Sequence, residues 1–204
     1  MQKIIYSTSL TLLLLTAITY ADIKTDEQVE VKKNYLLKIE LDKVNEVLSK
    51  DYEKYGIFHL KVAEDYKAIS ETYFSMGKYD ESIEYALSAL KVAMKLQKDN
   101  DPTLAKLYFD TGNKYYMHKQ HPTAILYMKK AANIYENSPK KESLALANTY
   151  EGIASTYINL EDYKKSLLYN EKALSLRKKL LPQEDESLQR SIQNSIFIRE
   201  KLKK

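Results

Sequence analysis

The sequence predicts an all-α fold, a solenoid of antiparallel helix pairs, and three observations lead to this prediction. First, segments that begin at Ala63, Ala105 and Ala147 align without gaps, so they repeat at a constant offset of 42 residues. Second, large and small residues within each segment recur three, four or seven positions apart, which is the spacing of one helix face. Third, the 204-residue chain has only four Gly and four Pro, too few turn residues for a β-sandwich or β-barrel.

The aligned positions indicate how each repeat folds. Small side chains let two helix backbones approach closely, and tyrosines can fill the space beside them. Each repeat is therefore predicted to be two antiparallel helices, with most tyrosines acting as packing residues. The small residues form the columns Ser70/Gly112/Ala154, Ser82/Ala124/Ser166 and Ala89/Ala131/Ala173, and the tyrosines form Tyr66/Tyr108/Tyr150, Tyr73/Tyr115/Tyr157 and Tyr85/Tyr127/Tyr169.

Residues 1–21 have the three-part layout of a secretory signal peptide. The basic residue Lys3 precedes an apolar stretch from Ile4 to Ile18, and small residues ending at Ala21 precede a predicted cut before Asp22. We therefore predict an exported protein, periplasmic or secreted, whose mature chain contains no stable membrane span. The alternative is an uncleaved membrane anchor, although the stretch is shorter than the roughly 20 apolar residues of a transmembrane helix.

Residues 22–62 precede the repeats, and two interpretations of this segment stay open. Carried backwards, the 42-residue frame places Leu41, Val44, Val47 and Leu48 on the inner face of a second helix. The segment is then either a degenerate first repeat or a long helical cap.

Residues 63–186 hold the three repeats and their linkers, and residues 187–204 are predicted to form one amphipathic capping helix. We expect Ile192, Ile196 and Phe197 to point inward from this helix. Its charged end suits a cap, because a repeat array needs a polar end to stay soluble.

The repeats resemble a known family. The pattern from Ala63 to Leu90 (AEDYKAISETYFSMGKYDESIEYALSAL) is similar to a tetratricopeptide repeat, and the 42-residue period with its Asp101-Pro102 linker resembles the subclass found in kinesin light chains. The second repeat departs from the pattern, with Lys119 and His121 where glycine and tyrosine are usual. The resemblance implies a right-handed superhelical solenoid that works by binding other proteins.

The resemblance also implies where a partner binds. In such arrays the first helix of each pair lines a concave groove, which accepts a peptide or a helix. Phe74, Tyr116 and Ile158 share one column, which forms either an apolar stripe across the groove or a contact with the next repeat. The predicted groove residues, left free by the packing columns, are Lys67, Glu71, Phe74, Lys106, Phe109, Asn113, Tyr116, Met117, Asn148, Glu151, Ser155, Ile158 and Asn159.

Composition and motifs argue against other functions. The 32 basic and 28 acidic residues are interspersed, so no basic face for nucleic acid stands out. Without cysteine the chain has no disulfide, thiolate metal site or cysteine nucleophile. Phosphate-binding, serine-nucleophile and zinc-protease motifs do not occur, and His118 and His121 lack further ligands nearby. We therefore predict no enzyme activity, no metal site and no cofactor.

The predicted function is a non-enzymatic scaffold or adaptor of the cell envelope or periplasm that binds a protein or peptide. Two alternatives stay open. One is a structural module that associates with its own copies, and the other is a cytoplasmic adaptor if the N-terminus is not a signal peptide.

Overall fold

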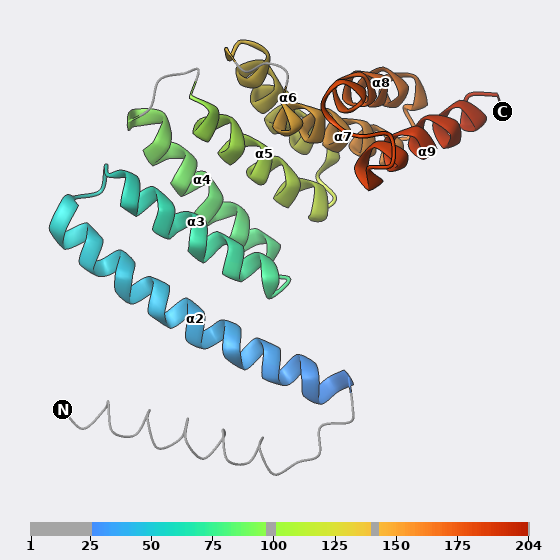
Figure 1. Ribbon diagram of the computed structural model, residues 1–204. Coiled ribbons are helices and arrows are strands. Elements are labelled where there is room, and N and C mark those ends of the chain that lie inside the picture. Colours follow the sequence, from blue (N-terminus) through green and yellow to red (C-terminus); the bar gives the residue numbers. More distant parts are fainter. Residues whose placement is uncertain (1–25, 97–100, 140–142, 204) are drawn as a thin grey trace, which may run out of the picture. The chain divides into compact units, whose positions relative to one another are not determined.

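The computed structural model describes residues 26–96, 101–139 and 143–203 (Figure 1). These residues form helices and no strand, which confirms the predicted all-α repeat fold. The predicted signal segment, residues 1–21, lies outside them. The helices are α2 (Asp26–Tyr55), α3 (Leu60–Ser75), α4 (Tyr79–Leu96), α5 (Pro102–Met117), α6 (His121–Glu136), α7 (Leu144–Asn159), α8 (Tyr163–Leu180) and α9 (Glu186–Lys201).

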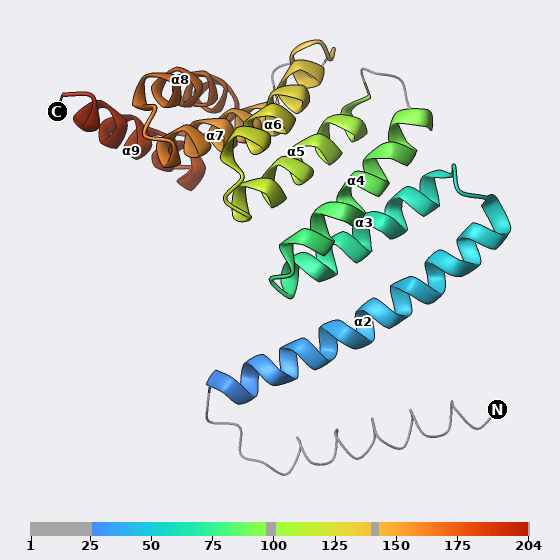
Figure 2. The same cartoon turned by 180° about the vertical axis from the view of Figure 1, so that it is seen from behind.

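The chain divides into two units, Met1–Lys43 and Val44–Lys204. In the second unit α3 packs against α4, α5 against α6 and α7 against α8, and each pair contacts the next through neighbouring helices. Both views of the ribbon show this succession, with α9 following α8 (Figures 1 and 2). The helix pairs therefore coincide with the 42-residue repeats.

The columns of small residues lie where the two helices of a pair touch. In the first pair, the Ser70 hydroxyl donates to the Ser82 carbonyl at 2.6 Å, and the Ser82 hydroxyl donates to the Ser70 carbonyl at 2.7 Å. In the third pair, the Ser166 hydroxyl donates to the Ala154 carbonyl at 2.9 Å. In the second pair, a Cβ on Gly112 would lie 2.7 Å from a side-chain carbon of the facing helix. Only small residues fit at these contacts.

Three tyrosines pack together in every pair. In the first pair Tyr85 lies between Tyr66 and Tyr73, with ring centroids 6.1 and 5.5 Å away. The second pair repeats the arrangement at 6.1 and 5.2 Å, and the third at 6.0 and 5.9 Å. Aromatic pairs at these distances stabilise a fold beyond the area they bury. The tyrosine columns are therefore packing residues.

The turn inside each pair has the same geometry three times. Gly77, Lys119 and Glu161 follow one another at 42-residue intervals and have positive φ angles of 73°, 60° and 56°. At the second turn the backbone N–H of Gln120 donates to the carbonyl of Tyr115 at 2.9 Å, and equivalent bonds close the other two turns. This pattern is the Schellman end of a helix. Glycine adopts it freely, whereas Lys119 and Glu161 adopt it with strain.

Each first helix also begins at an equivalent capping residue. His59, Asp101, Ser143 and Asp185 are 42 residues apart, and each side chain accepts a hydrogen bond from a backbone N–H of the helix that follows. The repeat frame thus continues into α9, which begins as the first helix of a fourth pair.

α2 is one continuous helix of 30 residues. Tyr52 stands 42 residues before Met94, and its hydroxyl bonds to that of Tyr66, much as Met94 Sδ accepts a hydrogen bond from Tyr108 at 3.5 Å. The last turns of α2 therefore take the place of a second helix before α3. None of the four apolar residues expected on an inner face is fully buried, and Val47 is 46% exposed.

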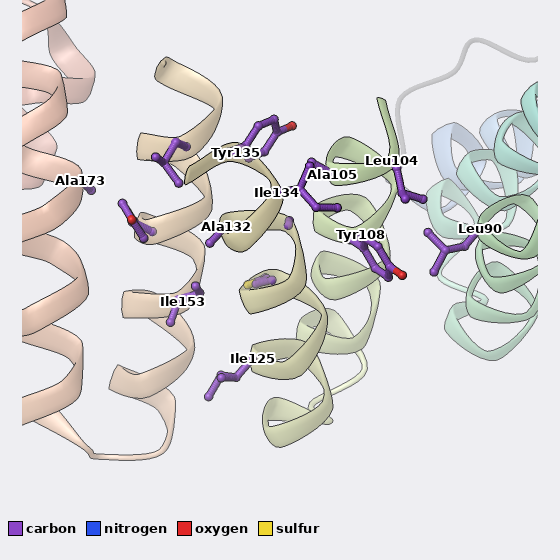
Figure 3. Packing of buried hydrophobic residues seen from close by; sticks show 14 of the residues in the cluster. Leu90, Leu104, Ala105, Tyr108, Ile125, Ala132, Ile134, Tyr135, Ile153 and Ala173 are labelled. Carbon is purple, nitrogen blue, oxygen red and sulfur yellow. The ribbon is translucent and has the colours of Figure 1, made fainter. Parts of the chain in front are cut away.

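The core of the second unit runs from α4 to α8. Figure 3 shows Leu90 of α4 beside Leu104 and Tyr108 of α5, and the same cluster continues through Ile153 of α7 to Ala173 of α8. All five residues are buried. Apolar side chains from successive repeats therefore form one continuous cluster.

α9 packs against α8 with a face other than the expected one. Ile196 and Phe197 are 47% and 43% exposed, so the expectation that they point inward was wrong, whereas Ile192 is half-buried. The reason is that polar groups of α8 bond to serines of α9, an interface that apolar periodicity does not reveal. The buried residues of α9 are Leu188, Ser191, Ser195 and Ile198.

Candidate protein-interaction groove

Two adjoining hollows lie along the first helices of the pairs, one of about 640 Å³ and one of about 410 Å³. Asn113 and Tyr116 of α5 line both of them. We call the two hollows together the groove. The larger is lined by Phe109, Asn113, Tyr116, Met128, Asn148, Glu151, Gly152, Ser155, Arg177, Ser187, Arg190 and Asn194, and the smaller by Glu71, Phe74, Asp110, Asn113, Lys114, Tyr116 and Met117.

The floor of the larger hollow depends on a glycine of α7. A Cβ added to Gly152 would lie 3.2 Å from both Met128 Sδ and Phe109 Cε2. Met128 is only 1% exposed, so it has little room to move away. A larger residue at this position would therefore crowd the side chains that line the hollow.

The polar end of the larger hollow is organised by Arg177 of α8, which is 2% exposed. Its guanidinium donates to Glu151 Oε2 at 2.6 Å and to Asn148 Oδ1 at 2.7 Å, both on α7. It also donates to the carbonyl of Ser187 at 3.3 Å and to the hydroxyl of Ser191 on α9. A buried charge is tolerated when it is paired and hydrogen-bonded in this way. One arginine thus joins three helices and positions two groove side chains.

The smaller hollow combines a buried ammonium group with an aromatic ring. Lys114 is 7% exposed, and its Nζ lies 5.3 Å from the centre of the Phe74 ring. Burial lowers the pKa of Lys114, and the nearby carboxylates of Asp110 and Glu71 oppose that shift. This hollow therefore offers charged groups of both signs beside apolar surface.

Family models match the region of the helix pairs. Models described as tetratricopeptide repeat match residues 61–137 and residues 146–186. The chain belongs to the tetratricopeptide-repeat family. Solenoids of this kind bind other molecules on their concave surfaces, so the chain is a protein-interaction scaffold. No curated protein matches the sequence.

Solved tetratricopeptide-like structures share the fold. A candidate kinesin light chain of Podosopora anserina aligns over 85% of this chain and 83% of that chain, with a TM-score of 0.72 and 12% identity. BtubC of P. vanneervenii aligns over 88% and 85%, with a TM-score of 0.65 and 13% identity. Apo RapI aligns over 99% of this chain and 56% of its own, with a TM-score of 0.64 and 17% identity. At these identities the likeness shows the fold alone.

Most residues predicted to face a partner line the groove of these tetratricopeptide repeats. Lys67 and Lys106 do not, and each instead pairs with an acid on its own helix, at 3.1 Å from Glu71 and 3.8 Å from Asp110. Ile158 and Asn159 also lie outside both hollows. The predicted residues that the structure brings together are Glu71, Phe74, Phe109, Asn113, Tyr116, Met117, Asn148, Glu151 and Ser155.

The apolar column on the first helices is divided between two roles. Phe74 and Tyr116 both line the smaller hollow, whereas Ile158 is half-buried outside the groove. Tyr116 also packs against the buried core cluster. The column is therefore part groove and part packing surface, between the two interpretations that the sequence left open.

Sequence reasoning missed several residues of the groove. Arg190 and Asn194 of α9 lie 42 residues after Asn148 and Gly152, so extending the frame by one more repeat would have found them. Arg177 shares a column with a tyrosine and an alanine, which carries no signal of a polar role. The residues that it missed are Lys114, Met128, Gly152, Arg177, Ser187, Arg190 and Asn194.

A third hollow, of about 540 Å³, lies on α6, α7 and α8 and shares no lining residue with the groove. The Tyr150 hydroxyl donates to the Glu136 carboxylate there, and burial together with this bond raises the pKa of Tyr150. Leu146, Leu168 and Leu176 line the rest. This hollow offers mainly apolar surface.

No group of three His, Asp or Glu side chains among the described residues is placed to hold a metal ion. His118 Nδ1 lies 3.4 Å from Asp80 Oδ1, a contact between neighbouring repeats in which the His118 side chain is half-buried. No helix of the described ranges is long and apolar enough to cross a membrane.

Proposed function

We propose that this protein holds a peptide or helix of a partner protein in the groove, as a non-enzymatic scaffold or adaptor. The observation that carries the proposal is that Asn113 and Tyr116 border both hollows. A bound segment can therefore run along the first helices α3, α5, α7 and α9 without leaving the groove.

The lining of the groove fits a polypeptide ligand. Phe109, Tyr116 and Met128 offer apolar contacts for side chains. Asn113 and Asn194 have no hydrogen-bond partner among the described residues, so their amides are free to bond with the backbone of a ligand. Apolar contacts supply affinity, while a few placed polar groups fix the orientation of the ligand.

A photo-reactive amino acid placed at Met117 or Ser155, which line the smaller and the larger hollow, tests this proposal in cells. The matched controls carry it at Leu126 of α6 and Leu168 of α8, which are 53% and 54% exposed away from the groove. We expect the two groove positions to form adducts with the same partner protein and the two controls to form none with it. Adducts from the control positions alone would contradict binding in the groove.

We further propose that the protein works in the cell envelope or periplasm, or is secreted. Support comes from the basic start, the apolar stretch and the small residues of positions 1–21. The intact mass of the protein recovered from cell fractions tests this, with Asp22 as the expected first residue. A retained Met1 in the membrane fraction would support an anchor instead, and a retained Met1 in the cytosol would support a cytoplasmic adaptor.

A further inference from the structure

One face of α9 is uncovered, whereas the equivalent face of every other first helix is covered by the second helix of its pair. In the third pair, the first helix packs against its own second helix through Tyr150, Ala154 and Tyr157, which are 6%, 2% and 7% exposed. The positions 42 residues later are Ile192, Ile196 and Arg199, and no helix follows α9 within the described residues. Ile196 is accordingly 47% exposed where Ala154 is 2% exposed.

This face is separate from the contact that holds α9 on α8. Leu188, Ser191, Ser195 and Ile198 attach α9 to α8, so the Ile192 and Ile196 side of the helix can accept a partner without rearrangement. In the other pairs, the corresponding face contacts an antiparallel helix. The geometry therefore calls for another antiparallel helix.

Charge along α9 indicates which helix fits. The helix begins at an acidic cluster, Glu184, Asp185 and Glu186, and ends among the basic residues Arg199, Lys201 and Lys203, with Glu200 as the one acid there. By helical spacing, Asp185 and Lys203 fall on the same side as Ile192 and Ile196. In an antiparallel pair of two such helices, each acidic start faces a basic end, and Ile192 of one meets Ile196 of the other.

We propose that a second copy of this chain covers the face, through an antiparallel α9–α9 contact about a two-fold axis. A two-fold contact uses the same patch on both copies and closes on itself, so it yields a dimer and no larger assembly. One helix from each copy buries less surface than the roughly 1,200–2,000 Å² of stable complexes, so we expect a weak dimer that forms within the micromolar range. The inference goes beyond ligand binding in the groove, since each copy keeps its own groove.

Sedimentation velocity of the full chain across the micromolar range tests the proposal. Wild type should shift from monomer to dimer, and Ile196→Lys should stay monomeric at concentrations where wild type is half dimeric. Leu168→Lys, at an equally exposed leucine of α8, should dimerise like wild type. Helical circular dichroism confirms that each variant is folded. Dimerisation that persists in Ile196→Lys, an all-monomeric wild type, or a ladder of larger species would overturn the proposal.

A covalent trap tests the orientation independently. Because the chain has no cysteine and Ile192 of one copy meets Ile196 of the other, a mixture of Ile192→Cys and Ile196→Cys chains can form a disulfide between these two positions. Mild oxidation should link this mixture and should link little in a mixture of Ile196→Cys and Leu168→Cys chains. Equal yields of mixed dimer from the two mixtures, or no mixed dimer of Ile192→Cys with Ile196→Cys, would show that α9 does not pair with α9 in this way.

Discussion

At the scale of single residues, Gly112 decides how closely α5 and α6 pack. A Cβ there would lie 2.7 Å from Met128 Cγ and 3.2 Å from the carbonyl oxygen of Ala124. Met128 is 1% exposed and Ala124 is fully buried, so neither has free space beside it. The second pair therefore tolerates no side chain at this position.

We predict that Gly112→Leu lowers the free energy of unfolding by about 1–3 kcal/mol or more, because the added atoms force the helices apart. Thermal melts followed by helical circular dichroism measure the effect. Lys119→Leu is the control, since Lys119 is exposed in the turn and both side chains meet the same backbone strain there. Equal melting temperatures for the two variants would contradict the repeat alignment.

The three equivalent turns provide a second prediction. A left-handed backbone costs a non-glycine residue about 1–2 kcal/mol, and a change to glycine removes this strain. Glycine also has more conformational freedom in the unfolded chain, which offsets part of the stability gained. Lys119→Gly should therefore stabilise the protein by about 0.5 kcal/mol, measured by urea denaturation. Gly77→Ala should do the opposite, because its added Cβ meets nothing within 4 Å and only the backbone conformation is penalised. A destabilised Lys119→Gly variant would show that this turn is not strained.

At the scale of helices, α9 is attached by polar groups as much as by apolar ones. Arg177 and Asn170 of α8 are 2% and 0% exposed, and both donate to serines of α9. Arg177 also pairs with Glu151 in the groove at 2.6 Å. The attachment of α9 and the shape of the groove therefore depend on one guanidinium group.

We predict that Arg177→Met lowers the free energy of unfolding by on the order of 3 kcal/mol, because it leaves the Glu151 carboxylate and the serines of α9 without their partner. Amide hydrogen exchange should show α9 losing protection first. The matched control is Arg199→Met, whose pair with Glu171 has side chains 61% and 48% exposed and should matter little. A similar loss in both variants, or unchanged exchange in α9, would contradict the role assigned to Arg177.

The same helix shows how far sequence patterns reach. Periodicity predicted the helix pairs, the columns of small residues and the columns of tyrosines, because the same helix–helix contacts recur in each repeat and use similar residue types. It misplaced Ile196 and Phe197, because apolarity marks what a helix could bury and not whether a partner is there to cover it. It also missed Arg177, because a buried arginine is defined by bonds to Glu151 and to α9 that only the fold brings together.

At the scale of the whole molecule, the groove is a property of the stack and not of any one repeat. Its lining comes from four first helices and from Met128 and Arg177 behind them. Most first-helix positions that the family resemblance picked out line the two hollows, because those positions follow from the packing columns by elimination. The groove floor could not be predicted that way, since it depends on how neighbouring repeats meet.

Binding of the cross-linked partner to variants of Asn113 tests the central claim most directly. Asn113 borders both hollows and has no hydrogen-bond partner among the described residues. Asn113→Ala therefore removes a side-chain amide from the groove, and we expect little change in the free energy of unfolding. Asn133→Ala on α6, exposed and outside the groove, is the matched control. Titration calorimetry should show Asn113→Ala weakened about tenfold, as expected when a ligand loses a hydrogen bond worth about 1.4 kcal/mol, and Asn133→Ala should bind like wild type. Full affinity in a folded Asn113→Ala variant would contradict binding in the groove.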